Sequence, residues 1–236
     1  MEDFITLRNQ RGIAVATGEL VADRKQRVRQ IFKNLQETAS RNNSNLQEVV
    51  RLVVMVSDMD RDRPLVNEVQ REFWGERGPF PCRTIIEVDY LAGDFIEIDI
   101  VLRIGNKSGE NFTQVAPKKI FTPTGPWSLG IKTKTYIFVS GMRGIDPETN
   151  QLVVGEAPRI RQAFYNLRTV TEAAEGKLAN AVALVIYTTD EKYFNIIEML
   201  QNKFWEGATP PPTSINICDA LNDRDVFEIE GTFIVE

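Results

Sequence analysis

Apolar positions in the first half of the chain follow two different periods. Residues 24–40 place Val28, Ile31, Phe32 and Leu35 on one side, a spacing that predicts an amphipathic helix lying on a sheet. Residues 62–74 predict a second helix of the same kind. Apolar runs and alternations predict strands at residues 4–9, 12–18, 46–57, 82–88 and 94–104, the first two joined as a hairpin.

The same pattern occurs a second time along the chain. VRQIFKNL at residues 28–35 returns as IRQAFYNL at 160–167, and the pair Phe73-Trp74 returns as Phe204-Trp205. ATG at residues 16–18 is matched with VSG at 139–141. Because the order is kept, we expect a second copy of one structural unit. Its first helix would bury Ile160, Ala163, Phe164 and Leu167.

The polar, glycine-containing stretch GNKSGENFTQVAPKK has no hydrophobic period and is typical of a linker. We therefore predict two α+β domains, residues 1–106 and 119–236, joined by residues 107–118. Each would be a mixed sheet with two helices on one face. The other face of each sheet needs a cover, and self-association of that face is the simplest one.

Composition removes several function classes. The chain has 236 residues, 42% of them hydrophobic, and a net charge of -5 without a basic stripe, which argues against nucleic acid as a partner. It has no histidine, two cysteines and no glycine-rich phosphate loop, so metal sites, Ser-His or Cys-His nucleophiles and nucleotide cofactors lack support. Cys82 and Cys218 are interpreted as counterparts in the two copies, or as chance, rather than as a disulfide.

The chain also lacks an apolar run of about 18 residues, which a membrane span would need. Its N-terminal residues, MEDFITLRNQ, do not have the basic and apolar regions of a secretory signal. We therefore expect a soluble cytoplasmic protein that does not bind membranes, with the mitochondrion as the alternative compartment.

The segments FPCRT at residues 80–84 and FIEID at 95–99 stand on the two closing strands of the first copy. Together with the order of the other elements, they resemble the Rid/YjgF family of imine and enamine deaminases, and each half of the chain resembles one such domain. The resemblance implies a chorismate-mutase-like fold and trimers whose helix-free sheet faces pack into a barrel. It also implies clefts between neighbouring subunits and a reaction without cofactors.

In copy 1 the resemblance assigns four parts of a site. Arg83 would clamp a substrate carboxylate, and Asp99 would place the attacking water. Thr17 and Gly18 would line the cleft as the family's turn of a small hydroxyl residue and glycine. Phe4, thirteen positions before Thr17, falls where many members carry tyrosine.

Copy 2 keeps a different part of the pattern. Trp127 follows Gly125-Pro126 as the family's aromatic residue, Ser140 and Gly141 form the turn, and Glu230 is the acid. Thr213 stands where the arginine should be. The resemblance therefore predicts that copy 2 has no carboxylate clamp of its own. Trp127, Ser140, Gly141 and Glu230 would then contribute to substrate binding in a shared cleft.

The chemistry explains why an arginine is needed. A guanidinium replaces the lost hydration of a carboxylate with two parallel charge-assisted hydrogen bonds, each worth roughly 1.5–3 kcal/mol, whereas threonine offers one neutral donor. Strand alternation puts Arg83 and Glu87 on one face of their strand, and Glu97 and Asp99 on one face of theirs. Glu97 is therefore added to the substrate-binding candidates. The alternative interpretation is that Arg83 only neutralises these acids.

The hypothesis from sequence is hydrolysis of a small 2-imino or enamino acid to a 2-keto acid and ammonia. The substrate would be a small carboxylate, and three chains would supply six domains for trimeric rings. A non-catalytic protein that binds or senses 2-keto acids, or a scaffold of the same fold, is the alternative. Ribonuclease activity, attached to some relatives, is disfavoured by the acidic charge and the absence of histidine.

Overall fold

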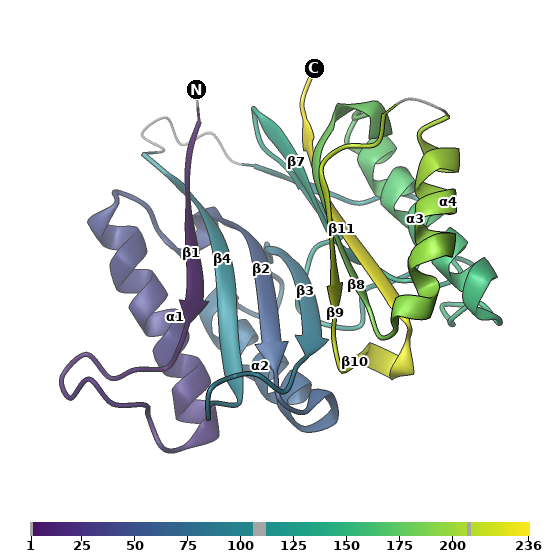
Figure 1. The fold of residues 1–236 in the computed structure, drawn as a ribbon. Coiled ribbons are helices and arrows are strands. Elements are labelled where there is room, and N and C mark those ends of the chain that lie inside the picture. The colour runs from purple at the N-terminus through teal and green to yellow at the C-terminus, as the bar shows by residue number, and fades with distance from the viewer. Residues whose placement is uncertain (1, 106–111, 207–208) are drawn as a thin grey trace. The chain divides into compact units, whose positions relative to one another are not determined.

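The computed structural model describes residues 2–105, 112–206 and 209–236 and divides into two compact units. The first comprises Met1–Asn111 with Gly125–Trp127, and the second comprises Phe112–Thr124 with Ser128–Glu236. Residues 107–111 of the predicted linker lie outside the described residues. Each unit has its own mixed sheet and its own helices, which confirms the predicted α+β class (Figure 1).

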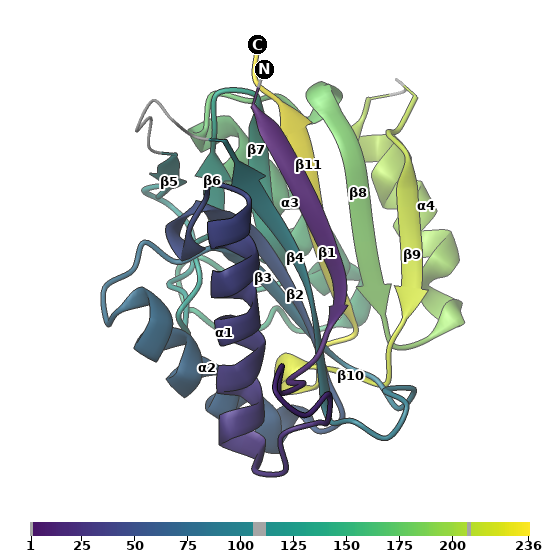
Figure 2. The same ribbon diagram turned by 90° about the vertical axis from the view of Figure 1, so that its left-hand side faces the viewer.

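The first unit has the strand order β1-β4-β2-β3. β2 and β3 run parallel, and the other neighbours run antiparallel. Figures 1 and 2 show both of its helices on the same side of this sheet. The elements are β1 (Asp3–Gln10), α1 (Arg24–Arg41), η1 (Leu46–Glu48), β2 (Val49–Val56), α2 (Met59–Trp74), β3 (Cys82–Glu87) and β4 (Ile96–Ile104).

Aspartate caps start both helices of this unit. The side chain of Asp23 accepts a hydrogen bond from the Gln26 amide at 2.8 Å, and that of Asp58 accepts one from the Arg61 amide at 3.0 Å. The predicted stripe of α1 is buried against the sheet. These are the helices that the hydrophobic pattern predicts, with α2 beginning three residues earlier.

The second unit has the strand order β5-β6-β7-β11-β8-β9. Its longest helix buries all four residues of the predicted stripe. The elements are β5 (Thr113–Val115), β6 (Gly130–Lys132), β7 (Tyr136–Met142), α3 (Glu156–Ala173), η2 (Leu178–Asn180), β8 (Ala181–Thr188), η3 (Glu191–Tyr193), α4 (Phe194–Phe204), β9 (Thr213–Ile217), β10 (Ala220–Leu221), η4 (Asn222–Arg224) and β11 (Phe227–Ile234).

The predicted hairpin of residues 4–9 and 12–18 does not form. β1 pairs with β4, and residues 12–18 make a turn in which the amides of Thr17 and Gly18 donate to the Ala14 carbonyl. Only an isolated bridge between Ile13 and Leu20 remains of a second strand. Gly18 has φ 73°, a left-handed conformation that favours glycine and closes the turn.

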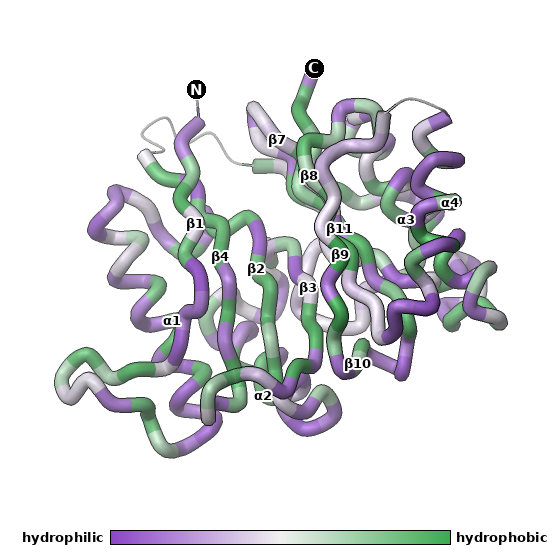
Figure 3. Tube along the Cα trace, in the orientation of Figure 1, coloured by the Kyte–Doolittle hydropathy of each residue, from purple (hydrophilic) through white to green (hydrophobic). Residues whose placement is uncertain are grey.

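Hydrophobic and hydrophilic positions alternate along β4, so one side of this strand packs on the helices and the other carries acids (Figure 3). Ile96, Ile98, Ile100 and Leu102 belong to the core under α1 and α2. Among the described residues, no helix is both long enough and apolar enough to cross a bilayer.

Both cysteines are buried thiols outside any disulfide among the described residues, but they are not counterparts. The Cys218 amide donates to the Thr188 carbonyl at 3.0 Å, as the Val88 amide does to the Val56 carbonyl at 2.9 Å. Cys218 therefore corresponds to Val88, and the interpretation that Cys82 is its partner position is wrong.

Candidate functional site

Arg83 lies on β3 and points toward helix α2. It pairs with Leu52 of β2, a residue of the core that packs under the helices. Arg83 Nη1 donates a hydrogen bond of 2.8 Å to Gln70 Oε1 on α2. Arg83 is 5% exposed and Gln70 is 0% exposed. The guanidinium is therefore held in place at a buried position, as a clamp requires.

The segment Gly125–Trp127 belongs to the same compact unit as Arg83. A Cβ atom on Gly125 would lie 3.0 Å from Arg83 Nη2, 3.1 Å from Trp127 Cδ1 and 3.3 Å from Asn67 Oδ1. These distances are shorter than ordinary contacts of such an atom, so a side chain at residue 125 would force the polar groups of Arg83 and Asn67 to shift. Trp127, a predicted substrate-binding residue, thus lies close to the predicted clamp.

Asp99 and Glu97 lie on the face of the sheet that carries no helix. They pair with Val53 and Met55 of β2, whereas Arg83 pairs with Leu52. Neighbouring residues of a strand point to opposite faces. The two acids therefore face away from Arg83, and the interpretation that Arg83 neutralises them within this unit is wrong.

Each of these acids has a contact on β1 or just after it. Asp99 Oδ1 accepts a hydrogen bond of 2.8 Å from the Asn9 amide, at the irregularity in the pairing of β1 with β4. Glu97 Oε1 lies 3.7 Å from Arg11 Nε. Asp99 remains half-buried.

The strand register identifies the true counterparts of Ser140 and Gly141. β1 pairs antiparallel with β4, the strand that carries Glu97 and Asp99, and β7 pairs antiparallel with β11, the strand that carries Glu230. Each pairing has an irregularity, between Leu7 and Gln10 in the first unit and between Ile229 and Gly231 in the second. Leu7 pairs with Ile100 as Val139 pairs with Gly231. Ser140 and Gly141 therefore correspond to Arg8 and Asn9.

The prediction that equates Thr17-Gly18 with Ser140-Gly141 is wrong. The sequence RGI occurs at residues 11–13 and again at 143–145, and this repeat matches Thr17-Gly18 with Thr149-Asn150 in an exposed turn. By the same register Phe4, which pairs with Arg103, corresponds to Tyr136, which pairs with Ile234. The site roles predicted for Thr17, Gly18 and Phe4 depended on that alignment, so the strand register no longer supports them.

Ser140 and Gly141 lie inside β7, next to two buried acids. The Ser140 hydroxyl donates to the Ser128 carbonyl, which fixes its orientation. A Cβ atom on Gly141 would lie 1.7 Å from Glu228 Oε1, so any larger residue here would collide with the Glu228 carboxylate. Glu228 and Glu230 share one face of β11 and are 5% and 2% exposed. Sequence reasoning missed Glu228, although FEIEG places it two residues before Glu230.

Thr213 occupies the position of Arg83 in the second unit. It pairs with Leu184 on β8, the counterpart of Leu52 on β2. Gln201 Nε2 donates a hydrogen bond of 2.6 Å to Thr213 Oγ1, which in turn donates to the Pro211 carbonyl at 2.9 Å. The glutamine that holds Arg83 is thus repeated in copy 2, where it holds a threonine.

Both halves of the chain match one family model. The model is described as Endoribonuclease L-PSP, and it matches residues 2–104 and 117–235. The chain belongs to this family. Its members include the Rid/YjgF proteins that the sequence resembles, so each half is a Rid domain.

Individual relatives each match one Rid domain. A 2-iminobutanoate/2-iminopropanoate deaminase of Dermatophagoides farinae is 26% identical over 129 residues, which is 52% of this chain and 100% of the relative. A RutC family protein of Saccharolobus solfataricus is 35% identical over 128 residues, 53% of this chain and 94% of the relative. A solved structure of a probable translation initiation inhibitor from Rhodopseudomonas palustris is 35% identical, has a TM-score of 0.51 and covers 53% of this chain and 98% of its own.

A buried ion-pair network precedes the acid strand of the first Rid domain. Asp94 accepts hydrogen bonds from Arg27 Nη1 at 2.7 Å and from Arg11 Nε at 3.0 Å. Burial raises the pKa of this carboxyl, but hydrogen bonds from Arg27, the Phe95 amide and Arg11 outweigh it, so its pKa lies below the ordinary value. The network anchors the turn that carries Thr17 and Gly18.

The second Rid domain repeats this network in a looser form. Asp225 lies 3.7 Å from Arg159 Nη1 and 3.9 Å from Arg143 Nη1, while Arg143 donates to the Asn222 carbonyl at 2.7 Å and to Asp223. Burial is the largest influence and raises the pKa of Asp225 above its ordinary value. The arginine that should neutralise this acid is partly engaged elsewhere.

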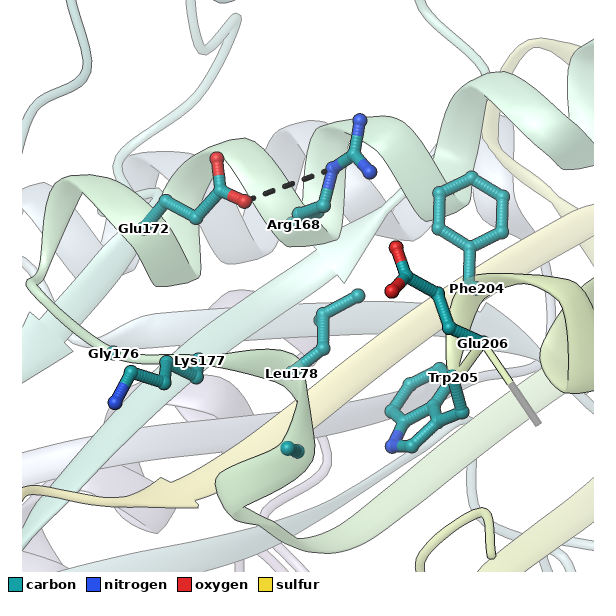
Figure 4. A pocket seen from close by; sticks show the side chains of 9 residues that line it. Arg168, Glu172, Gly176, Lys177, Leu178, Phe204, Trp205 and Glu206 are labelled. Carbon is teal, nitrogen blue, oxygen red and sulfur yellow. Dashed lines mark ion pairs between the residues drawn. The ribbon is translucent and has the colours of Figure 1, made fainter. Parts of the chain in front are cut away.

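A hollow of about 240 Å³ lies in the second Rid domain between α3 and the end of α4 (Figure 4). Arg168 and Glu172 lie on one side of it, 3.8 Å apart, and Phe204 and Glu206 lie on the other. Thr213 does not line it. Within the described ranges, no group of three or more histidine, cysteine, aspartate or glutamate side chains is placed to hold a metal ion.

Proposed function

We propose that the chain hydrolyses small 2-imino or enamino acids and that Arg83 binds the substrate carboxylate. The observation that carries this proposal is the buried guanidinium of Arg83, held by Gln70 and approached closely by Gly125. A guanidinium fixed at a buried position can bind a carboxylate through two parallel charge-assisted hydrogen bonds, so such a site favours a small anion. A relative named as an iminobutanoate and iminopropanoate deaminase supports the same substrate class.

The reaction adds water across the C=N bond and then breaks it. Water oxygen bonds to the imine carbon, both water protons end on nitrogen, and the nitrogen leaves as ammonia while the carbon becomes a ketone. The chain has no histidine, so a carboxylate is the side chain best suited to accept the first proton. Asp99 takes this role in the proposal, in place of the longer glutamate of the family.

The geometry of the first unit requires a second domain for this chemistry. Since Arg83 and Asp99 face opposite sides of one sheet, an Arg83 site must take its acid from another Rid domain. Assembly of chains into trimeric rings would supply that acid from a neighbouring chain. A sedimentation or native mass measurement giving only monomers would contradict this assembly.

The test is ammonia release from 2-iminobutanoate and 2-iminopropanoate, generated in the assay from the amino acids by an L-amino acid oxidase. The wild-type chain is expected to accelerate ammonia release over buffer, and Arg83→Ala is expected to abolish the acceleration. Arg41→Ala, which removes an exposed arginine near the end of α1, serves as the control and should behave like wild type. A wild-type chain no faster than buffer on every imine would refute the proposal.

Thr213 favours one alternative function. A chain that has lost one of two carboxylate clamps could have kept Arg83 for binding a 2-keto acid without turnover. This alternative predicts saturable binding of 2-oxobutanoate that depends on Arg83, together with no acceleration of imine hydrolysis. The same two variants therefore separate the two functions.

A further inference from the structure

Two polar atoms next to Arg83 are buried without a hydrogen-bond partner among the described residues. They are Nε2 of Gln70 and Oδ1 of Asn67. Both residues lie on α2, three positions apart, and therefore on the same face of the helix. A buried polar atom without a partner is unfavourable, because it has lost its hydrogen bonds to water. Two such atoms beside a buried arginine indicate a place that a ligand completes.

The donor and acceptor character of the two Gln70 side-chain atoms is fixed by Arg83. A guanidinium only donates hydrogen bonds, so the Gln70 atom that it contacts must be the oxygen. The remaining Gln70 atom is therefore an N–H donor. Asn67 Oδ1 is an acceptor and lies 3.3 Å from the point that a Cβ of Gly125 would occupy, while Arg83 Nη2 lies 3.0 Å from the same point.

We infer that Asn67 and Gln70 complete the Arg83 site and let it distinguish a 2-imino acid from its 2-keto acid product. This inference rests on the proposed function. Gln70 Nε2 joins Arg83 in binding the carboxylate, and Asn67 Oδ1 accepts the hydrogen bond of the imine N–H on the adjacent carbon. Gln70 also positions Arg83 through its oxygen.

The discrimination follows from hydrogen-bond polarity. An imine nitrogen carries a proton that can point at Asn67 Oδ1, whereas a ketone oxygen in the same place has only lone pairs. Two acceptors facing each other in a buried site repel, and neither is paired. The site therefore releases the product more readily than it holds the substrate, which limits product inhibition.

The Gln70 part is tested with Gln70→Glu, which keeps an oxygen for Arg83 but replaces the N–H donor with a negative oxygen. KM for 2-iminobutanoate and the Kd of 2-oxobutanoate are both expected to rise tenfold or more, since a charged hydrogen bond is lost. Gln70→Met, which removes both contacts, should have at least the same effect. The matched control is Gln201→Glu on α4, at the corresponding position beside Thr213, and it should leave both constants unchanged.

The Asn67 part is tested with Asn67→Leu, and here the two ligands should respond in opposite directions. KM for 2-iminobutanoate is expected to rise about tenfold, whereas 2-oxobutanoate should bind a few-fold more tightly because the opposing acceptor is gone. A parallel loss for both ligands would show a merely structural role and overturn the inference. Glu198→Leu, at the corresponding position of α4, is the control.

The readouts separate this inference from the proposed function. If wild-type chain releases no ammonia from any imine, the deaminase proposal fails, and the binding measurements with 2-oxobutanoate still decide the role of Gln70. If ammonia is released but Gln70→Glu and Asn67→Leu both match wild type in KM, Kd and melting temperature, the inference is overturned and the deaminase proposal stands.

Discussion

Arg83 and Asp99 pair with adjacent residues of β2, Leu52 and Val53, and therefore lie on opposite faces of one sheet. β3 and β4 flank β2, so the two side chains are separated by the sheet and not by distance along it. A site that uses both residues must combine two domains. Catalysis by Arg83 and Asp99 therefore depends on the assembly of domains.

Mixing two defective chains should therefore restore activity. Arg83→Ala and Asp99→Asn are each expected to abolish imine hydrolysis, because each removes one half of the site. Unfolded together and refolded as a mixture, they should form assemblies in which an intact Arg83 of one chain meets an intact Asp99 of another. Ammonia release measures the recovery.

The control for this experiment is a chain that carries both substitutions, refolded with either single variant. In either mixture one of the two residues is absent from every chain, so no site can be rebuilt and activity should stay at background. Full activity of Asp99→Asn by itself would remove Asp99 from the reaction and assign the proton to a different acid.

Thr213→Arg should create a second carboxylate clamp. Gln201 already lies at the position from which Gln70 accepts the hydrogen bond of Arg83, so an arginine at residue 213 has its partner in place. Calorimetric titration with 2-oxobutanoate should show one site per chain in wild type and two in the variant. Adding Gln201→Leu to Thr213→Arg removes that partner and should return the stoichiometry to one.

The helices and most strands were predictable because their signals are redundant. Each stripe of α1 and α3 has four apolar positions on one side, and packing buries all of them. The match of Thr17-Gly18 with Ser140-Gly141 rested on two small residues, and it failed. The counterparts Arg8 and Asn9 have unrelated side chains, and only the strand pairing with its irregularity identifies them.

Gly125→Ala should weaken substrate binding without unfolding the chain. The added Cβ would lie 3.0 Å from Arg83 Nη2 and 3.3 Å from Asn67 Oδ1, so both polar groups must move. We expect a rise in KM of about tenfold, the loss of roughly one charged hydrogen bond, with a melting temperature close to that of wild type. Thr124→Ala, at the exposed neighbouring residue, is the control.

The polar residues around Arg83 could not be predicted from the sequence. Asn67 and Gln70 stand on an amphipathic helix, where polar residues are ordinarily interpreted as facing water. Gln70 is instead buried and accepts a hydrogen bond from Arg83. This partner lies on a strand and is thirteen residues later in the chain. Trp127 lies in the same unit as Arg83 because the chain returns to the first unit at Gly125–Trp127.

The two ion-pair networks should respond differently to pH. The folded pKa of Asp94 lies below its ordinary value, so its contribution to stability is fully present above the pKa of the unfolded chain, about 3.9. That contribution is lost as the pH falls through the lower folded value. Asp225 has a raised folded pKa, so its favourable contribution is present at low pH and is lost as the pH rises through that value.

Asp94→Asn and Asp225→Asn therefore form a matched pair for urea unfolding at pH 7 and pH 3. At pH 7, Asp94→Asn should lower the free energy of unfolding by about 3 kcal/mol, since two arginines lose a buried partner. Asp225→Asn should lower it by much less, because the arginines lie 3.7 and 3.9 Å away and Asp225 Oδ2 has no hydrogen-bond partner among the described residues. At pH 3 the difference between the two variants should shrink, because pH 3 lies below the ordinary aspartate pKa of about 3.9, so residue 94 of the unfolded wild-type chain is then largely protonated and the contribution of Asp94 to stability is reduced. Equal losses at pH 7 would contradict the assignment of a tight network to the first unit and a loose one to the second.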